Sequence, residues 1–303
     1  MYRYNAFSLN FSSEFELPEC NAAEAPSDDF VIRNTQLPLP DLEPTNIFRR
    51  GIAAQTCVDT DGSLWLHWPN VATYRATSGS LLEVDVISKD PEIISLFTVS
   101  EALGLILFQR NKLLLHASAV KAGNEGWVFL GTPGAGKSTT CAAFVKAGCQ
   151  LLSDDLTAIT FDEQGNPLIC PAYPQLKIWE GTVKGLGYNT GELRPVSEGV
   201  NKFSLTPREN FPVAAVPLQR IYFINHPGEI LSNPIVPPSR FPSEVIKHFP
   251  MPNQFLDQST LIRYFQQSLM CLNSASAYDI SRPEDFEKLE AWVQDTLVEA
   301  CRD

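Results

Sequence analysis

The spacing of hydrophobic residues divides the chain into three regions of different texture. In residues 1 to about 100, hydrophobic and polar positions alternate in short runs, which is typical of half-buried β-strands. We predict strands at residues 2–11, 29–33, 63–68, 73–76 and 81–87, and a Pro-rich loop at residues 37–45. The pattern predicts a β-rich domain. Because this region contains no recognisable chemical motif, it does not indicate what the domain does.

The pattern changes to helical spacing at residues 91–110 and then to alternating strands and helices as far as about residue 225. We predict strands at 113–120, 126–130, 150–160 and 218–224, and a helix at 138–147 with Gly148 as its C-cap. A strand, a helix and a strand in this order predict a parallel α/β sheet. From about residue 239, helical spacing returns at 243–249, 257–271 and 283–301.

Composition narrows the classes of partner. The net charge of −12 argues against a grip on nucleic acid or anionic membrane, which requires clusters of Lys and Arg. No uninterrupted apolar run is long enough to span a membrane, and we expect that the first residues are not a signal peptide. The seven scattered cysteines form no CxxC pair and indicate reduced thiols. We therefore expect a cytoplasmic protein without nucleic-acid or membrane partners, and homo-oligomerisation stays open.

Residues 131–138, GTPGAGKS, match the phosphate-loop pattern GxxxxGK[ST] at every fixed position. The glycines let backbone amides approach phosphate oxygens, and the following helix adds its N-terminus to this anion site. Lys137 would neutralise the β- and γ-phosphates and assist catalysis, and Ser138 would place its hydroxyl on Mg²⁺. The predicted nucleotide-binding residues are Gly131, Thr132, Pro133, Gly134, Ala135, Gly136, Lys137, Ser138 and Thr139. The alternative is a Gly-rich turn that caps a helix, which the strand before the loop disfavours.

An acidic pair, Asp154 and Asp155, ends an apolar strand segment 17 residues after Lys137. One helix and one returning strand fit this interval, so we expect both carboxylates beside the bound phosphates. One can hold Mg²⁺ and the other can accept the proton of an attacking hydroxyl. The alternative is an ordinary turn at the end of a strand, where Asp is common. His116, in the strand before the loop, is by itself more typical of a core histidine.

The segments LHASAV, GTPGAGKST and LLSDD, in this order and spacing, resemble the catalytic domain of HPr kinase/phosphorylase. They are more similar still to bacterial HPr-kinase-like proteins, which have a different N-terminal region. The resemblance covers residues 95–225 well and implies an α/β fold. That fold has a P-loop kinase core of the HPr kinase/phosphoenolpyruvate carboxykinase type, preceded by a β-rich N-terminal domain at 1–95. C-terminal helices complete a catalytic domain at 96–303.

The resemblance also implies an activity, namely an ATP- and Mg²⁺-dependent kinase that phosphorylates a hydroxyl, a serine, of a protein or peptide. It places His116 near the transferred phosphate, gives Asp154 the role of base and puts Asp155 with Ser138 on the metal side. Lys177, Arg194 and Lys202 are candidate phosphate or substrate contacts, or solvated surface cations. The loop reads GTPGAGKS where HPr kinases typically have GDSGxGKS, and a second signature is missing, so HPr is not implied as the substrate.

Two other classes of function remain open from the sequence. One is a regulatory or interaction module that binds nucleotide without productive transfer, motivated by the long N-terminal region without a motif. The other is a small-molecule kinase or P-loop hydrolase. The sequence has no NKxD motif and no second strand ending in an acidic pair, so a small-molecule kinase or P-loop hydrolase is less favoured.

Overall fold

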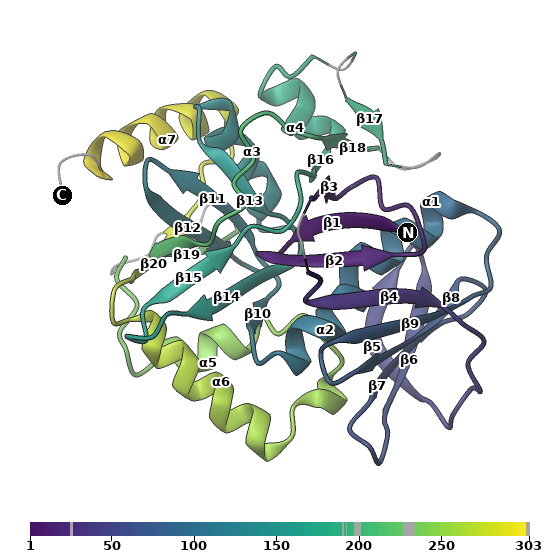
Figure 1. The fold of residues 1–303 in the computed structure, drawn as a ribbon. Coiled ribbons are helices and arrows are strands. Elements are labelled where there is room, and N and C mark those ends of the chain that lie inside the picture. Colours follow the sequence, from purple (N-terminus) through teal and green to yellow (C-terminus); the bar gives the residue numbers. More distant parts are fainter. Residues whose placement is uncertain (25–26, 190, 192, 197–200, 227–233, 301–303) are drawn as a thin grey trace. The chain divides into compact units, whose positions relative to one another are not determined.

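The computed structural model describes residues 1–24, 27–189, 191, 193–196, 201–226 and 234–300. The chain divides into two compact units (Figure 1). Unit 1 consists of Met1–Leu114 and Phe249–Gln267, and unit 2 of Leu115–His248 and Ser268–Asp303. A strand, β10 (Leu113–Leu115), and a helix, α6 (Gln258–Cys271), run across the boundary along the chain. The functional division expected at residue 95 stays a prediction.

Unit 1 is built on a nine-stranded sheet with the order β3-β1-β2-β4-β9-β8-β7-β6-β5. The strands are β1 (Tyr2–Ala6), β2 (Leu9–Ser13), β3 (Asn21–Ala22), β4 (Phe30–Asn34), β5 (Glu43–Arg49), β6 (Ile52–Val58), β7 (Leu64–Trp68), β8 (Ala72–Thr77) and β9 (Leu81–Val86). The predicted β-rich region is confirmed, although the segment 2–11 is a hairpin whose turn residues Phe7 and Ser8 have positive φ. The sequence did not indicate β5, because Pro44 and its polar residues argue against a strand.

One face of this sheet packs against the predicted helix at 91–110, which consists of three segments. They are α1 (Pro91–Phe97), a π-helical turn (Thr98–Ala102) and α2 (Leu103–Gln109). By length and composition alone the stretch Pro91–Gln109 could cross a membrane, yet 78% of its most apolar window is buried. Trp68 meets Phe97 edge to face at 5.0 Å, so packing on the sheet accounts for the hydrophobicity.

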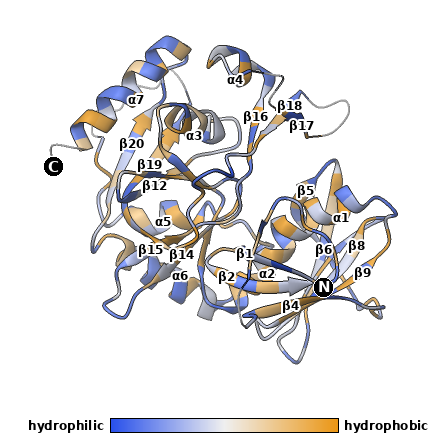
Figure 2. Cartoon of the chain, turned by 45° about the horizontal axis from the view of Figure 1, so that its top comes forward, coloured by the Kyte–Doolittle hydropathy of each residue, from blue (hydrophilic) through white to orange (hydrophobic). Residues whose placement is uncertain are grey.

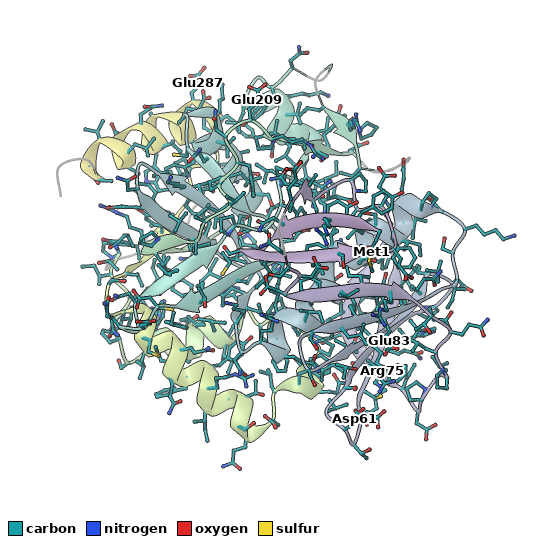
Figure 3. The ribbon with its side chains drawn as sticks, viewed as in Figure 1. Met1, Asp61, Arg75, Glu83, Glu209 and Glu287 are labelled. Atoms are coloured by element: carbon teal, nitrogen blue, oxygen red, sulfur yellow. The ribbon has the colours of Figure 1, made fainter. Side chains whose placement is uncertain are left out.

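Charged side chains of unit 1 neutralise one another at its surface. Arg75 on β8 contacts Asp61 at 3.1 Å and Glu83 at 3.6 Å (Figure 3). The most sheltered ion pair joins Arg49 to Glu101 through two hydrogen bonds of 2.9 and 2.8 Å. A short 3-10 helix (Asn253–Phe255) also belongs to unit 1.

The main sheet of unit 2 runs in the order β14-β15-β19-β12-β11-β13, and β20 pairs with β19. Its strands are β11 (Ser118–Ala122), β12 (Glu125–Leu130), β13 (Gln150–Ser153), β14 (Thr157–Phe161), β15 (Pro167–Cys170), β19 (Val216–Asn225) and β20 (Ser276–Ser281). A small sheet contains β16 (Leu176–Trp179), β18 (Lys202–Leu205) and β17 (Arg194–Pro195). The helices are α3 (Lys137–Lys146), α4 (Glu180–Gly185), α5 (Phe241–Ile246) and α7 (Phe286–Ala300). The mixed α/β class is confirmed.

The predicted strand–helix–strand unit is wrong in one respect. The strand that follows α3, β13, does not lie beside β12, because β11 stands between them and is antiparallel to both. The tight β11–β12 hairpin already occupies that edge of β12, and the chain returning from α3 must pair one strand further out. The parallel neighbours are instead β12, β19 and β20, and β20 lies between the helices predicted at 257–271 and 283–301, where the sequence indicated no strand.

The core of unit 2 is aromatic. Phe144 of α3 contacts Trp127 and Phe129 of β12 at ring-centroid distances of 5.5 and 5.2 Å, and Trp292 of α7 at 5.8 Å. Hydrophilic and hydrophobic residues share α7 (Figure 2), and its buried Leu289 and Val293 are four residues apart, on one face. This packing fixes α3, and therefore the loop before it, against the sheet.

Candidate active site

Three adjacent parallel strands end at the same edge of the sheet in unit 2. The loop at 131–136 follows β12, His226 follows β19 and Arg282 follows β20. Ligand sites in α/β sheets form at the carboxyl ends of parallel strands, where the loops meet. The GTPGAGKS segment therefore lies where a strand, a loop and the N-terminus of a helix build an anion site (Figure 1).

The loop requires glycine at two positions. A Cβ on Gly131 would lie 2.6 Å from the carbonyl oxygen of Ile224, which the neighbouring strand cannot relieve. Gly136, with φ of 101°, adopts a left-handed conformation that other residues resist. Between them Thr132, Pro133 and Gly134 are exposed. The tip of the loop is accordingly open to a ligand.

Lys137 begins α3 and turns its side chain back over the loop. Its Nζ donates to the carbonyl oxygen of Gly131 at 2.8 Å, and the residue is buried. Burial lowers the pKa of Lys137, and the nearby Asp155 and Asp154 carboxylates oppose that shift. Among the described residues, no side chain caps the N-terminus of α3. Its first amides and the lysine therefore present positive charge on the same side of the loop.

Asp154 is a buried carboxylate that three groups hold in place. Oδ1 accepts hydrogen bonds from the hydroxyls of Ser138 at 2.9 Å and Ser118 at 2.7 Å. Oδ2 accepts from the backbone N–H of Lys177 at 3.0 Å. Burial and the neighbouring Asp155 raise the pKa of Asp154, and the hydrogen bonds from Ser118 and from the backbone N–H of Lys177 counter the rise. The structure thus joins Ser138 of the loop directly to the first residue of the acidic pair.

Asp155 breaks the predicted 150–160 strand, because its φ of 65° turns the chain between β13 and β14. Its carboxylate lies 3.6 Å from Nζ of the buried Lys177 and is 28% exposed. The two carboxylates therefore occupy different environments, one enclosed and one reachable from solvent.

His116 lies in the break between β10 and β11 and not within one continuous strand. Its Nδ1 is 3.0 Å from the carbonyl oxygen of Asp155, and its backbone N–H donates to the carbonyl oxygen of His248 at 2.7 Å. A carbonyl can only accept, so Nδ1 carries the proton and Nε2 has the free lone pair. Burial and Lys137 lower the pKa of His116, which keeps the ring neutral near pH 7.

The remaining predicted residues surround this centre. Ala135 is buried within the loop, and the Thr139 hydroxyl lies 2.9 Å from that of Thr182. Lys202 places its Nζ 5.5 Å from the centre of the Trp179 ring. Arg194 lies exposed on β17, in register with Ser204.

The sequence missed four residues at the site: Ser118, His226, His248 and Arg282. Ser118 follows His116 by two residues in LHASAV, a spacing that could have indicated a shared face. His226 lies 3.2 Å, through Nε2, from the Thr132 hydroxyl. Arg282 packs on Gly136. No local signal could have revealed His226 or Arg282, because they reach the loop only through the pairing of β19 and β20 with β12.

The residues fit a magnesium ion held together with nucleotide phosphates. Hydroxyl and carboxylate oxygens are ligands that Mg²⁺ prefers, and Ser138 and Asp154 bring one of each within 2.9 Å. In the part of the chain that the structure describes, no group of three or more His, Cys, Asp or Glu could hold a metal by itself.

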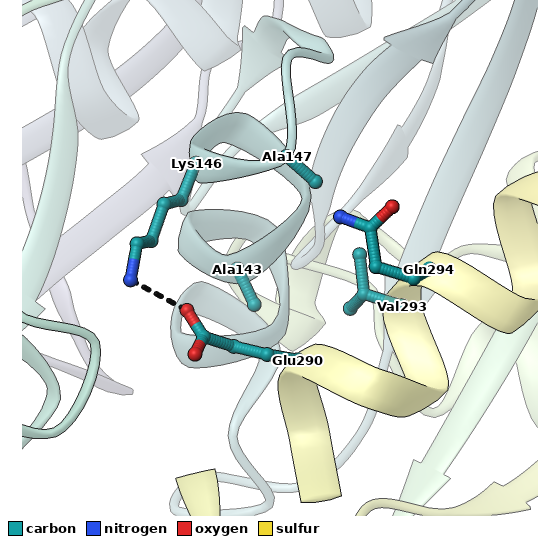
Figure 4. A pocket seen from close by; sticks show the side chains of 6 residues that line it. All are labelled: Ala143, Lys146, Ala147, Glu290, Val293 and Gln294. Carbon is teal, nitrogen blue, oxygen red and sulfur yellow. Dashed lines mark hydrogen bonds and ion pairs between the residues drawn. The ribbon is translucent and has the colours of Figure 1, made fainter. Parts of the chain in front are cut away.

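A separate hollow of about 270 Å³ lies between α3 and α7, lined by Ala143, Lys146, Ala147, Glu290, Val293 and Gln294 (Figure 4). Its two charged residues pair with each other, with Lys146 Nζ 2.6 Å from Glu290 Oε1. It lies toward the C-terminal end of α3, away from the loop that precedes this helix. Its charges neutralise each other, so we do not regard it as the reactive site.

Comparisons with known proteins give a distant likeness. No family model matches the sequence, and no curated protein matches it. Among solved structures, the chain is similar to the Hpr(Ser) kinase/phosphatase from Coxiella burnetii, with 16% identity and a TM-score of 0.34. The match covers 62% of this chain and 95% of the other.

Proposed function

We propose that this chain is an ATP- and Mg²⁺-dependent kinase that transfers the γ-phosphoryl group to a hydroxyl, a serine of a protein or peptide. The observation that carries the proposal is the hydrogen bond of 2.9 Å between Ser138 of the phosphate loop and the buried Asp154. A loop of this sequence binds phosphates with magnesium. A carboxylate enclosed at its serine, with a second carboxylate next in the chain, supplies the remaining parts of a phosphoryl-transfer site.

The distances favour a division of roles opposite to the one that the family resemblance implies. Asp154 shares its oxygen with Ser138 and is enclosed, which suits the metal side of the site. Asp155 is partly exposed and is steadied by Lys177, which suits a base that must reach an incoming hydroxyl. Ser138 and Asp154 would hold Mg²⁺, whose positive charge would help to neutralise the nucleotide phosphates.

The step that these residues support is an in-line displacement. The acceptor oxygen forms a bond to the γ-phosphorus, the bond from that phosphorus to the β–γ bridging oxygen breaks, and ADP leaves. The hydroxyl proton passes to Asp155, while Lys137 and the loop amides stabilise the charge on the transferred group. His116 is neutral, with Nε2 free to accept a hydrogen bond near the same carboxylate.

Labelled ATP, Mg²⁺ and candidate acceptors test the proposal. The acceptors are serine-containing peptides and the products of neighbouring genes, with phosphorylated residues identified by mass spectrometry. Asp155→Asn should lower turnover by about 100- to 10 000-fold and leave ADP affinity within a few-fold of wild type. Asp154→Asn should in addition raise the Mg²⁺ concentration needed for half-maximal ATP binding. Transfer no faster than slow ATP hydrolysis with every acceptor would count against a kinase.

A nucleotide-binding interaction module is the second candidate, because unit 1 is built on a nine-stranded sheet whose N-terminal sequence contains no recognisable chemical motif. In that case Asp155→Asn would leave partner binding unchanged, and wild type would show no transfer. A small-molecule kinase would phosphorylate a free hydroxyl compound but no peptide. The same assay separates the three outcomes.

A further inference from the structure

Arg282 reaches the phosphate loop from two strands away. The pairing of β12 with β19 sets Leu130 opposite Phe223, and the pairing of β19 with β20 sets Phe223 opposite Asp279. The loop that begins at Gly131 and the segment that begins at Arg282 therefore leave the same edge of the sheet within about two residues of each other. The topology brings a cation from residue 282 to a loop at residues 131–136.

The contact between Arg282 and the loop is direct. A Cβ added to Gly136 would collide with Nε of Arg282 and lie 3.0 Å from its Cδ and 3.1 Å from its Cζ. Gly136 is the N-cap of α3, where the helix presents its first amides. The guanidinium therefore lies at the positive end of α3 and not at its side.

Not every N–H donor of Arg282 has a hydrogen-bond partner among the described residues. Nη1 donates to the carbonyl oxygen of Pro283 at 2.9 Å, whereas the buried Nε has no hydrogen-bond partner among the described residues. Burial lowers the pKa of Arg282, and Glu284 opposes this shift. A buried guanidinium donor without an acceptor costs stability, and the guanidinium and the positive end of α3 repel each other. Both costs fall when an anion binds between them.

We propose that Arg282 is a second cationic contact for the nucleotide phosphates, in addition to Lys137. A guanidinium offers several N–H donors in a fixed fork that matches phosphate oxygens, and Lys137 acts as a point charge. Arg282 binds the β- or γ-phosphate of the same nucleotide that the loop holds. This inference rests on the proposed nucleotide site but assigns a residue that neither the loop pattern nor the acidic pair includes.

Calorimetric titration with ADP, ATP, AMP and adenosine tests the assignment without turnover. Arg282→Gln keeps the side-chain stem and removes the charge. It should weaken ADP and ATP binding by about 10- to 100-fold, AMP binding by much less and adenosine binding not at all. The dependence of ADP affinity on salt should become shallower, and Arg282→Lys should recover part of the loss. The matched control is Arg220→Gln, because Arg220 stacks on Trp127 near the other end of β12 and should leave ADP affinity unchanged.

The possible results separate cleanly. Equal losses for ADP and adenosine would show that Arg282 contacts the base and would overturn the proposal. Unchanged ADP affinity in a folded Arg282→Gln protein would overturn it as well, even with kinase activity intact. A lower melting temperature with unchanged ADP affinity in Arg282→Gln would make the contact with Gly136 purely structural. Wild-type protein that binds no nucleotide at all would overturn the proposed function itself.

Discussion

The two units treat buried charge differently. In unit 1, the polar residues that are fully buried are serines and threonines, whereas the fully buried charged residues that the structure describes all lie in unit 2. These are Lys137, Asp154, Lys177 and Asp279. In unit 1 the most sheltered ion pair, Arg49 with Glu101, still has 17% and 15% of its side chains exposed, and the two residues neutralise each other through two hydrogen bonds.

This difference in how charges are buried indicates a different purpose for the charges of each unit. A pair such as Arg49–Glu101 is complete within the protein, so its charges serve the fold. The cluster of Lys137, Asp154 and Lys177 holds enclosed charges beside an open loop, which is costly unless a ligand or a reaction uses them. Unit 1 is therefore expected to lose stability when its charges change, and unit 2 to lose chemistry.

The largest expected effect on stability is at the ion pair of unit 1. Arg49→Met leaves Glu101 sheltered without its partner and should lower the free energy of unfolding by about 3 kcal/mol at pH 7.5. Burial raises the pKa of Glu101, but Arg49 outweighs it and lowers the pKa below its usual value. Without Arg49, Glu101 can take up a proton, so the loss should shrink as the pH falls toward 4. Urea unfolding at several pH values measures this.

Lys137→Met is the matched variant in unit 2. It should reduce phosphoryl transfer by about 100- to 1000-fold, with little change or a gain in unfolding free energy, because it removes a buried charge. Arg49→Met should leave transfer unchanged. The proposed difference between the units would be wrong if Arg49→Met abolished phosphoryl transfer in folded protein, or if Lys137→Met unfolded the chain.

The sequence predicted the parts of this molecule that depend on neighbouring residues. The loop at 131–138, the helix that follows it and the β-rich character of unit 1 are local patterns, and the structure contains them. Gly148 was predicted as the C-cap of α3; the C-cap is Ala147, and Gly148, with φ of 99°, is the next residue. Asp154 and Ser138 lie together as the interval between them suggested.

What the sequence could not predict depends on strand pairing. The placement of β11 between β12 and β13, and of β20 beside β19, is decided by contacts between residues far apart in the chain. The sequence therefore could not place Arg282 or His226 beside the loop. The break at Asp155 was missed because apolar residues continue on both sides of it, and only the backbone conformation shows the turn.

Two glycines with similar backbone angles sharpen the contrast within unit 2. Gly136 and Gly148 have φ of 101° and 99°, but a Cβ at Gly136 would meet Arg282, whereas one at Gly148 would meet open space. Each change to Ala should cost about 1 kcal/mol for the left-handed backbone, and Gly136→Ala about 1 kcal/mol more for the contact. Only Gly136→Ala should weaken ADP binding in calorimetry. Equal ADP affinity in the two variants would contradict a role for the loop conformation.

The smallest expected effect is a pH dependence carried by His248 in unit 2, compared with His67 in unit 1. Burial, helped by Lys137 and His116, lowers the pKa of His248 to about 4, and burial also lowers that of His67, which contacts Thr73. In both cases the unfolded chain binds the proton more tightly, so stability falls as the pH drops below the ordinary histidine pKa of about 6.5. Between pH 7.5 and 5.5, wild type should lose about 1 kcal/mol that His248→Gln retains, and His67→Gln should retain less.

Urea unfolding of the three proteins at the two pH values measures the difference, since the carboxylates that also titrate are common to all three. A His248→Gln protein that loses as much stability as wild type would show that the neutral ring near Lys137 contributes nothing to the acid sensitivity of unit 2.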